Sequence, residues 1–196
     1  MEATSRLSTE IPAERQLRAD ARRNRARVLA AAEAVFAEVG VHAGIELIAH
    51  RAGVGVGTVC RNFATKEDLI AEVLTARGEA LLDVARAALA EADPAVAFER
   101  FMVAAASAAR YKALAEEMAL RGEVPIRESL RQDLHDALDQ LVRRAQGAGA
   151  LRSDVTADDI KLILSGLAQT AVTPGEESSR ERFLRVVLDG LRAGPR

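Results

Sequence analysis

Several residue types that stabilise small secreted or membrane proteins are scarce in this chain. It has one cysteine, no tryptophan, one tyrosine and five prolines among 196 residues, and aromatic residues make up 3%. A single cysteine excludes an intramolecular disulfide. No apolar run approaches the ~18 residues that cross a membrane, and no secretory signal is visible, so we expect a cytoplasmic protein with no membrane partner. Alanine, leucine, arginine and glutamate dominate instead, which favours helices and predicts an all-α fold.

Charge is distributed unevenly although the net charge is only −2. Residues 1–66 carry ten Arg and Lys against seven Asp and Glu, whereas residues 67–196 carry 17 against 22. Six arginines and two acids fall between Glu14 and Arg27. A short basic arm beside a weakly acidic body is typical of a DNA-binding head on a sensor domain, although a solvated tail has the same composition. We expect residues 1–22 to form this flexible basic arm.

Apolar residues recur at helical spacing along most of the remaining chain, and Gly or Pro punctuates the pattern. We expect about nine helices and no convincing strand. The expected helices cover 26–39, 45–52, 56–63, 66–92, 95–112, a shorter segment ending near 122, 126–146, 157–172 and 177–191.

The stretch AGVGVGTVCRNFATKEDL, residues 52–69, has glycines at 53, 55 and 57. A dinucleotide site requires a preceding strand, a G-x-G-x-x-G spacing and an acid about 20 residues later, and none of these is present. A P-loop requires Gly-Lys-Ser or Gly-Lys-Thr, and Lys66 does not follow a glycine. We therefore expect no nucleotide cofactor.

A helix-turn-helix explains more of the same residues. Gly53 stands where a tight turn between two short helices needs positive φ, and Ile48 and Val59 supply an apolar wedge between the helices. Gly55 and Gly57 then open the second helix, where absent side chains let the backbone approach a phosphate or the groove floor.

The segment VFAEVGVHAGIELIAHRAGVGVGTVCRNFATKEDLIAEVL, residues 35–74, resembles the TetR family of bacterial transcription regulators. The usual family pattern is I-A-x-x-A-G-V-x-x-G-T-x-Y-x-H-F-x-x-K-x-x-L. The matching residues are Ile48, Ala49, Ala52, Gly53, Val54, Gly57, Thr58, Phe63, Lys66 and Leu69. This resemblance covers about a quarter of the chain and implies a helix-turn-helix domain over residues 23–70. Residues 71–196 then correspond to a helical domain that binds a small apolar effector and forms a homodimer.

The resemblance also implies which residues contact DNA. Thr58, Asn62 and Lys66 correspond to phosphate contacts, which set the register without reading sequence. Arg61 suits either guanine or a phosphate, and Val56 offers only apolar contact to a thymine methyl. The expected DNA-binding residues are Arg25, Gly55, Val56, Gly57, Thr58, Cys60, Arg61, Asn62, Thr65 and Lys66.

Two positions depart from the family pattern, because Cys60 replaces the usual tyrosine and Asn62 the usual histidine. A thiol is a shorter and much weaker donor than a phenol, so we expect weaker contact there. A redox-sensing Cys60 is the alternative, but a small packing residue is favoured.

Neither metal binding nor catalysis finds support in the sequence. His42, Glu46 and His50 are spaced four apart, but His42 precedes the expected helix start and no fourth ligand follows, so surface placement is favoured. No Ser-His-Asp arrangement or close carboxylate pair stands out, and we expect no enzyme activity.

The effector and dimer residues are expected from helical stripes in the second half of the chain. The expected effector residues are Phe98, Phe101, Met102, Tyr111 and Met118. The expected interface residues, in the last two helices, are Ile160, Leu164, Leu167, Ala171, Phe183, Val187, Leu188 and Leu191. Both sets have an alternative reading as ordinary core. The function expected is a ligand-responsive repressor on a two-fold DNA operator. The alternatives are a helical small-molecule-binding protein with weak or lost DNA binding, a structural adaptor and an enzyme.

Overall fold

The computed structural model describes residues 12–40, 42–108, 111, 114–115, 118, 126–170 and 177–194. Eight helices have defined bounds within these ranges, and the one extended pairing there is an isolated bridge between Leu151 and Arg192. The helices are α1 (Pro12–Val39), α2 (Ile45–Ala52), α3 (Val56–Asn62), α4 (Lys66–Leu89), α5 (Pro94–Ser107), α7 (Glu128–Gly147), α8 (Ala157–Thr170) and α9 (Glu177–Leu191). The expected all-α fold is confirmed, and eight is close to the nine helices expected. The chain divides into two compact units, the first ending at Lys66 and the second beginning at Glu67.

Helix α1 begins at Pro12, well before the start expected near Ala26. Residues 12–22 of the expected arm are therefore helical, while residues 1–11 lie outside the described ranges. Proline suits a first helical turn, and the segment that follows is rich in Ala and Arg, which are good helix formers. Apolar periodicity does not detect such a helix because its N-terminal half buries no stripe.

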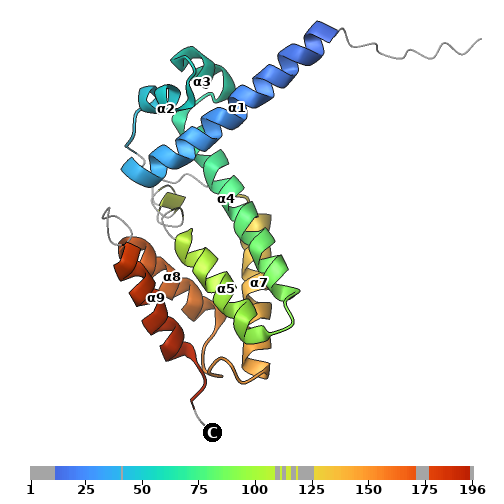
Figure 1. Ribbon diagram of the computed structural model, residues 1–196, viewed down its shortest axis with the longest axis vertical. Coiled ribbons are helices and arrows are strands. Elements are labelled where there is room, and N and C mark those ends of the chain that lie inside the picture. Colours follow the sequence, from blue (N-terminus) through green and yellow to red (C-terminus); the bar gives the residue numbers. More distant parts are fainter. Residues whose placement is uncertain are drawn as a thin grey trace, which may run out of the picture. The chain divides into compact units, whose positions relative to one another are not determined.

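The first unit is a three-helix head in which α1 packs against α2 and α3, and α2 packs against α3 (Figure 1). Its buried side chains are mostly small or branched, with two phenylalanines among them, and they come from all three helices and the segments beside them. They are Val28, Ala31, Ala32, Val35, Phe36, Ala43, Ile48, Ala49, Ala52, Val59 and Phe63.

The turn between α2 and α3 depends on Gly53. This residue ends α2 in the left-handed conformation, with φ 62° and ψ 40°. Its N–H donates to the His50 carbonyl at 3.1 Å, and the Val54 N–H donates to the Ala49 carbonyl at 3.0 Å. These bonds satisfy carbonyls that the end of a helix leaves without partners. The positive φ that the sequence predicts at Gly53 is confirmed.

The second unit is organised around α5, which packs against α7, α8 and α9 (Figure 1). Asp93 caps α5 by accepting from the N–H groups of Ala95 at 2.8 Å and Val96 at 3.3 Å. Thr156 and Asp159 form a capping box before α8, because each side chain accepts from the other's backbone N–H. These caps explain why α5 and α8 begin within one residue of the helix starts that the sequence predicts.

We expect Gly53→Ala to destabilise the head, because an L-residue with φ near +60° costs about 1–2 kcal/mol. The new Cβ would also lie 2.8 Å from Arg27 Nη2. Urea denaturation measures the loss. Gly57→Ala is the matched control, because a Cβ at Gly57 meets nothing within 4 Å. Equal stability of both variants would contradict a structural requirement for glycine at position 53.

Candidate nucleic-acid interface

Helix α3 presents its outer face to solvent and is held from behind by two buried side chains. Val59 is 1% exposed and Phe63 is 5% exposed, whereas Val56 is 41% exposed. Gly55, Gly57, Cys60 and Arg61 are also exposed. The structure therefore brings together on one accessible face the residues that the sequence predicts to approach DNA bases.

The polar residues of α3 are organised by hydrogen bonds among themselves. Asn62 Nδ2 donates to the Thr58 carbonyl at 2.8 Å, and Arg61 Nη2 donates to Thr58 Oγ1 at 3.1 Å. Thr58 and Asn62 are half-buried and Arg61 is exposed. Thr58, Arg61 and Asn62 thus form a short polar edge along the C-terminal half of α3.

Packing within the molecule does not explain Gly55 and Gly57. Gly55 has φ −73°, which other residues adopt readily. A Cβ added at either position meets nothing within 4 Å. Glycine inside a helix costs about 0.5–1 kcal/mol relative to alanine, so Gly57 weakens α3 without a benefit to its own packing.

Arg25 was expected to contact DNA, but the structure shows its guanidinium engaged within the head. Its Nη1 donates to the Asn62 carbonyl at 2.9 Å, and its Cζ lies 4.5 Å from the centre of the Phe63 ring. The side chain therefore joins α1 to the end of α3. Arg25 therefore supports the polar edge from the side of the head that α1 occupies.

Arg27 plays a similar part at the end of α2, and sequence reasoning gave it no individual role. Its Nη2 donates to the Ala52 carbonyl at 2.6 Å and to the Gly53 carbonyl at 3.0 Å. Arginines on α1 thus bind carbonyls at the C-terminal ends of both α2 and α3. Nothing in the arginine-rich segment distinguishes Arg25 and Arg27 from their neighbours, so this signal was absent from the sequence.

Other polar and charged residues lie on the surface of the head. Thr65 is exposed and Lys66, the first residue of α4, is half-buried. Arg51 donates to both carboxylate oxygens of Glu38, at 2.8 and 2.7 Å, and this pairing lowers the pKa of Glu38 below its ordinary value. Glu38 therefore stays ionised at neutral pH and offsets the charge of Arg51.

The His42, Glu46 and His50 triplet forms no metal site. His42 lies in the turn before α2, as expected from the sequence. Within the ranges that the structure describes, no three His, Cys, Asp or Glu side chains are grouped so that they can hold a metal ion.

Three of the expected effector residues fill the core of the second unit. Phe98, Phe101 and Met102 are 5%, 3% and 0% exposed and belong to one hydrophobic cluster. Tyr111 is half-buried, with the Arg77 guanidinium carbon 5.1 Å from its ring centre. Met118 is buried. Phe98 also borders a pocket of about 210 Å³ next to α9.

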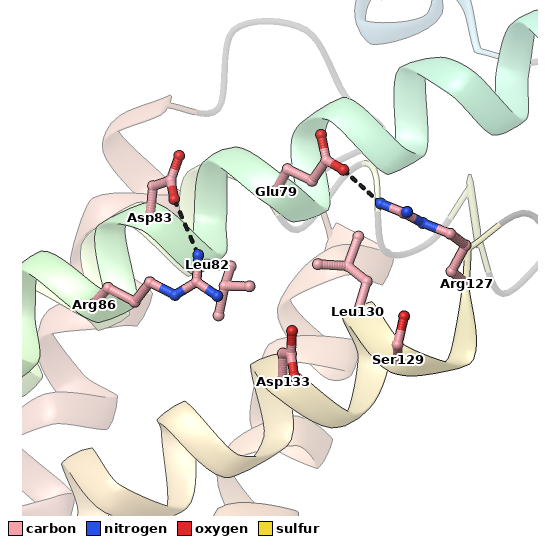
Figure 2. Close-up of a pocket in the computed structure, with 8 residues that line it drawn as sticks. All are labelled: Glu79, Leu82, Asp83, Arg86, Arg127, Ser129, Leu130 and Asp133. Atoms are coloured by element: carbon pink, nitrogen blue, oxygen red, sulfur yellow. Dashed lines mark hydrogen bonds and ion pairs between the residues drawn. The ribbon is translucent and has the colours of Figure 1, made fainter.

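A larger pocket of about 400 Å³ lies between α4 and α7, and none of the expected effector residues lines it. Figure 2 shows Glu79 and Arg127 facing each other at one end of it, where they form a 2.7 Å ion pair. Leu82 and Leu130 are its apolar residues, and the others that line it are polar or charged. Sequence reasoning missed this pocket because charged residues on exposed helical faces have no distinctive spacing.

Most of the residues expected at the dimer interface are buried or half-buried within one chain. Ile160, Leu164, Leu167 and Leu191 are at most 7% exposed within one chain, so they pack inward. Val187 and Leu188 are half-buried against the same core. Phe183 is 42% exposed, and Ala171 lies outside the described residues.

Besides Phe183, two apolar residues that were not expected at the interface are exposed on α8 and α9. Leu162 is 72% exposed and Val186 is 65% exposed. The sequence does not predict them, because the apolar spacing of each helix fits more than one face.

Two family models match the chain. The N-terminal domain of the tetR family of bacterial regulatory proteins matches residues 28–73, from the middle of α1 into α4. The C-terminal domain of SbtR-like transcriptional regulators matches residues 93–193, more than half of the chain. The chain belongs to the TetR family. It is therefore a transcriptional regulator of the DNA-binding helix-turn-helix type, and α2 and α3 lie within the matched N-terminal domain.

Solved structures agree with this assignment. A TetR transcriptional regulator from Streptomyces coelicolor is 36% identical over 87% of this chain and 99% of its own, with a TM-score of 0.69. A TetR regulatory protein from Mycobacterium vanbaalenii is 37% identical over 90% of this chain and 99% of its own, with a TM-score of 0.65. The search of curated proteins found no match. Among the described residues, no helix combines the length and hydrophobicity needed to cross a membrane.

We expect Arg25→Ala to destabilise the head by about 1–2 kcal/mol in the absence of DNA, because it loses a hydrogen bond and a cation–π contact. Urea denaturation gives the difference. Arg22→Ala removes an exposed arginine from the same helix and is the control, expected within about 0.5 kcal/mol of the parent. If Arg25→Ala is as stable as Arg22→Ala, the supporting role is wrong.

Proposed function

We propose that this TetR-family regulator is a repressor that binds a two-fold DNA operator as a homodimer and is released by a small apolar effector. One observation carries the DNA half of the proposal. At the start of α3, which is the recognition helix in this proposal, Gly55 and Gly57 are exposed where the molecule itself leaves room for side chains. In this proposal DNA packs closely against the helix at these two positions, which explains why both residues lack a side chain.

The polar edge of α3 supplies the positioning contacts in this proposal. The Thr58 hydroxyl, the Asn62 amide and the Lys66 ammonium bind phosphate oxygens and fix the register of the helix in the major groove. Arg61 is exposed and lies one turn after Gly57, so it reaches either a guanine edge or a phosphate. Thr65 adds an exposed hydroxyl beside Lys66.

The proposed homodimer uses the exposed faces of α8 and α9. On α9, Phe183, Val186 and Gly190 recur at three- and four-residue spacing, which places them on one face. On α8, Leu162 and Gly166 are exposed and four residues apart. A Cβ at Gly166 or Gly190 meets nothing within 4 Å, so a partner helix can approach closely at these positions.

The effector site in this proposal lies in the second unit, next to Phe98, Phe101, Met102, Tyr111 and Met118. Three of these residues fill the core, so an effector entering among them has to displace packed side chains. Ligand binding then changes the packing of α5 against α7 and α8. Such a change biases the equilibrium between two arrangements of a dimer.

The proposal is tested by incubating the purified protein with fragmented genomic DNA and sequencing the retained fragments. We expect enrichment of a short site with two-fold symmetry. Release of that site by an apolar compound found in a thermal-shift screen supports the effector, and increased transcription on release supports repression. If no fragment is enriched, the alternative of a helical small-molecule-binding protein without DNA binding is favoured.

We expect Gly57→Ala to move stability and DNA affinity in opposite directions. The fold gains up to about 1 kcal/mol because alanine suits a helix better. Operator affinity falls about tenfold, because an added methyl group in a tightly packed contact costs about 1–3 kcal/mol. Fluorescence anisotropy with the selected operator measures affinity. Gly147→Ala, at the end of α7, is the control with unchanged affinity. Unchanged affinity of Gly57→Ala would count against close approach at α3.

We expect Val186→Glu to weaken the homodimer about 100-fold or more, because burial of an unpaired carboxylate costs about 3 kcal/mol or more. Sedimentation equilibrium at micromolar concentration measures the dimer fraction. Val103→Glu introduces the same charge at an exposed valine of α5, 49% exposed, and is expected to leave the dimer intact. Equal dissociation of both variants, or of neither, would remove α9 from the interface.

A further inference from the structure

The face of α3 that the polar edge leaves uncovered is small and apolar. Val56 and Cys60 are four residues apart on this helix, so their side chains lie side by side on one face. Val56 is 41% exposed and Cys60 is an exposed free cysteine. A thiol is a weak donor that packs as a small apolar group. Val56 and Cys60, which we call the apolar pair, therefore present almost no hydrogen-bonding capacity.

Gly57 lies next to this pair in sequence and, like Gly55 before it, is exposed without a side chain. Valine and cysteine are short, and they reach the floor of a groove only if the helix backbone comes close. The two glycines allow that approach, since a Cβ at either site would extend into open space and hold the helix away. The glycines and the apolar pair thus meet the same geometric requirement.

The chemistry of the major groove limits what such a pair can bind. Guanine, cytosine and adenine present donors or acceptors there, whereas thymine adds the one apolar substituent, its 5-methyl group. A polar base edge pressed against valine and a thiol loses water without gaining a partner, which is unfavourable. The nearest strong donor, Arg61, donates to Thr58 Oγ1 and does not belong to the pair.

We infer that the apolar pair reads thymine methyl groups and makes Val56 and Cys60 specificity-determining residues of this regulator. This inference rests on the proposed binding of α3 in the major groove. The two residues are separated by about 6 Å along the helix axis, which corresponds to nearly two steps of about 3.4 Å along a DNA strand. Each operator half-site therefore contains one thymine contacted by Val56 and a second, one or two steps away, contacted by Cys60.

The test replaces each operator thymine in turn by deoxyuridine, which lacks the methyl group and keeps every hydrogen-bonding atom. The full-length protein is titrated against each substituted operator by fluorescence anisotropy. We expect about a fourfold loss of affinity at each of two positions per half-site, the change expected when one buried methyl group is lost, and little change at other thymines.

Variants connect each sensitive thymine to its residue. We call the loss of affinity on replacing a thymine by deoxyuridine the uridine penalty. In Val56→Ala the uridine penalty at one position is expected to disappear, and in Cys60→Ser the penalty at the other position is expected to disappear. Val39→Ala, which shortens a 54% exposed valine at the end of α1, keeps both penalties and is the matched control. If the penalties persist in Val56→Ala and Cys60→Ser, the apolar pair is not their source and the inference is wrong.

The outcomes separate this inference from the function on which it rests. Tight binding to a selected operator with no sensitivity to uridine would overturn methyl reading and leave the regulator function standing. Failure to retain any DNA fragment would overturn the proposed function itself. The inference and the proposed function are both supported if each half-site contains two thymines at which uridine weakens binding. Each of these losses of affinity must also disappear in one of the two variants.

Discussion

The left-handed turn at Gly53 determines how the recognition helix leaves α2, and the DNA-binding half of the molecule depends on it. The turn alone does not hold α3 in place, because α3 has seven residues and is too short to be stable by itself. Two side chains from α1 complete the arrangement: Arg27 binds the carbonyls around Gly53, and Arg25 binds the carbonyl of Asn62. The long first helix therefore supports both the turn of the helix-turn-helix and the C-terminal end of α3.

This arrangement divides the arginines of the basic segment into two groups. Arg25 and Arg27 donate to backbone carbonyls of the head, whereas Arg22 is exposed and Arg23 pairs with Asp20. A guanidinium that donates to backbone carbonyls keeps its long-range attraction to phosphates but has fewer N–H groups left to bind one directly. The positive charge of this segment therefore overstates how many of its side chains are available to DNA, and the same composition serves folding and recognition together.

Sequence reasoning performed well where local chemistry determines the answer. The bounds of α2, the positive φ at Gly53 and the starts of α4, α8 and α9 follow from caps, glycines and apolar spacing within a few residues. It failed where the answer depends on distant contacts or on the absence of a stripe. The N-terminal half of α1 is a polar helix without an apolar pattern, and the supporting role of Arg25 is visible only when α1 lies against α3.

Helices α8 and α9 show a further limit. A helix that packs inward on one face and exposes apolar residues on another has two apolar stripes, and periodicity does not state which one faces the core. On α8, Ile160, Leu164 and Leu167 fill the core while Leu162 is 72% exposed. The longer stripe belongs inside because a core residue needs apolar neighbours on all sides. Within a single chain, an interface residue has neighbours on one side only. The shorter and more exposed stripe is therefore the one that a partner subunit can cover.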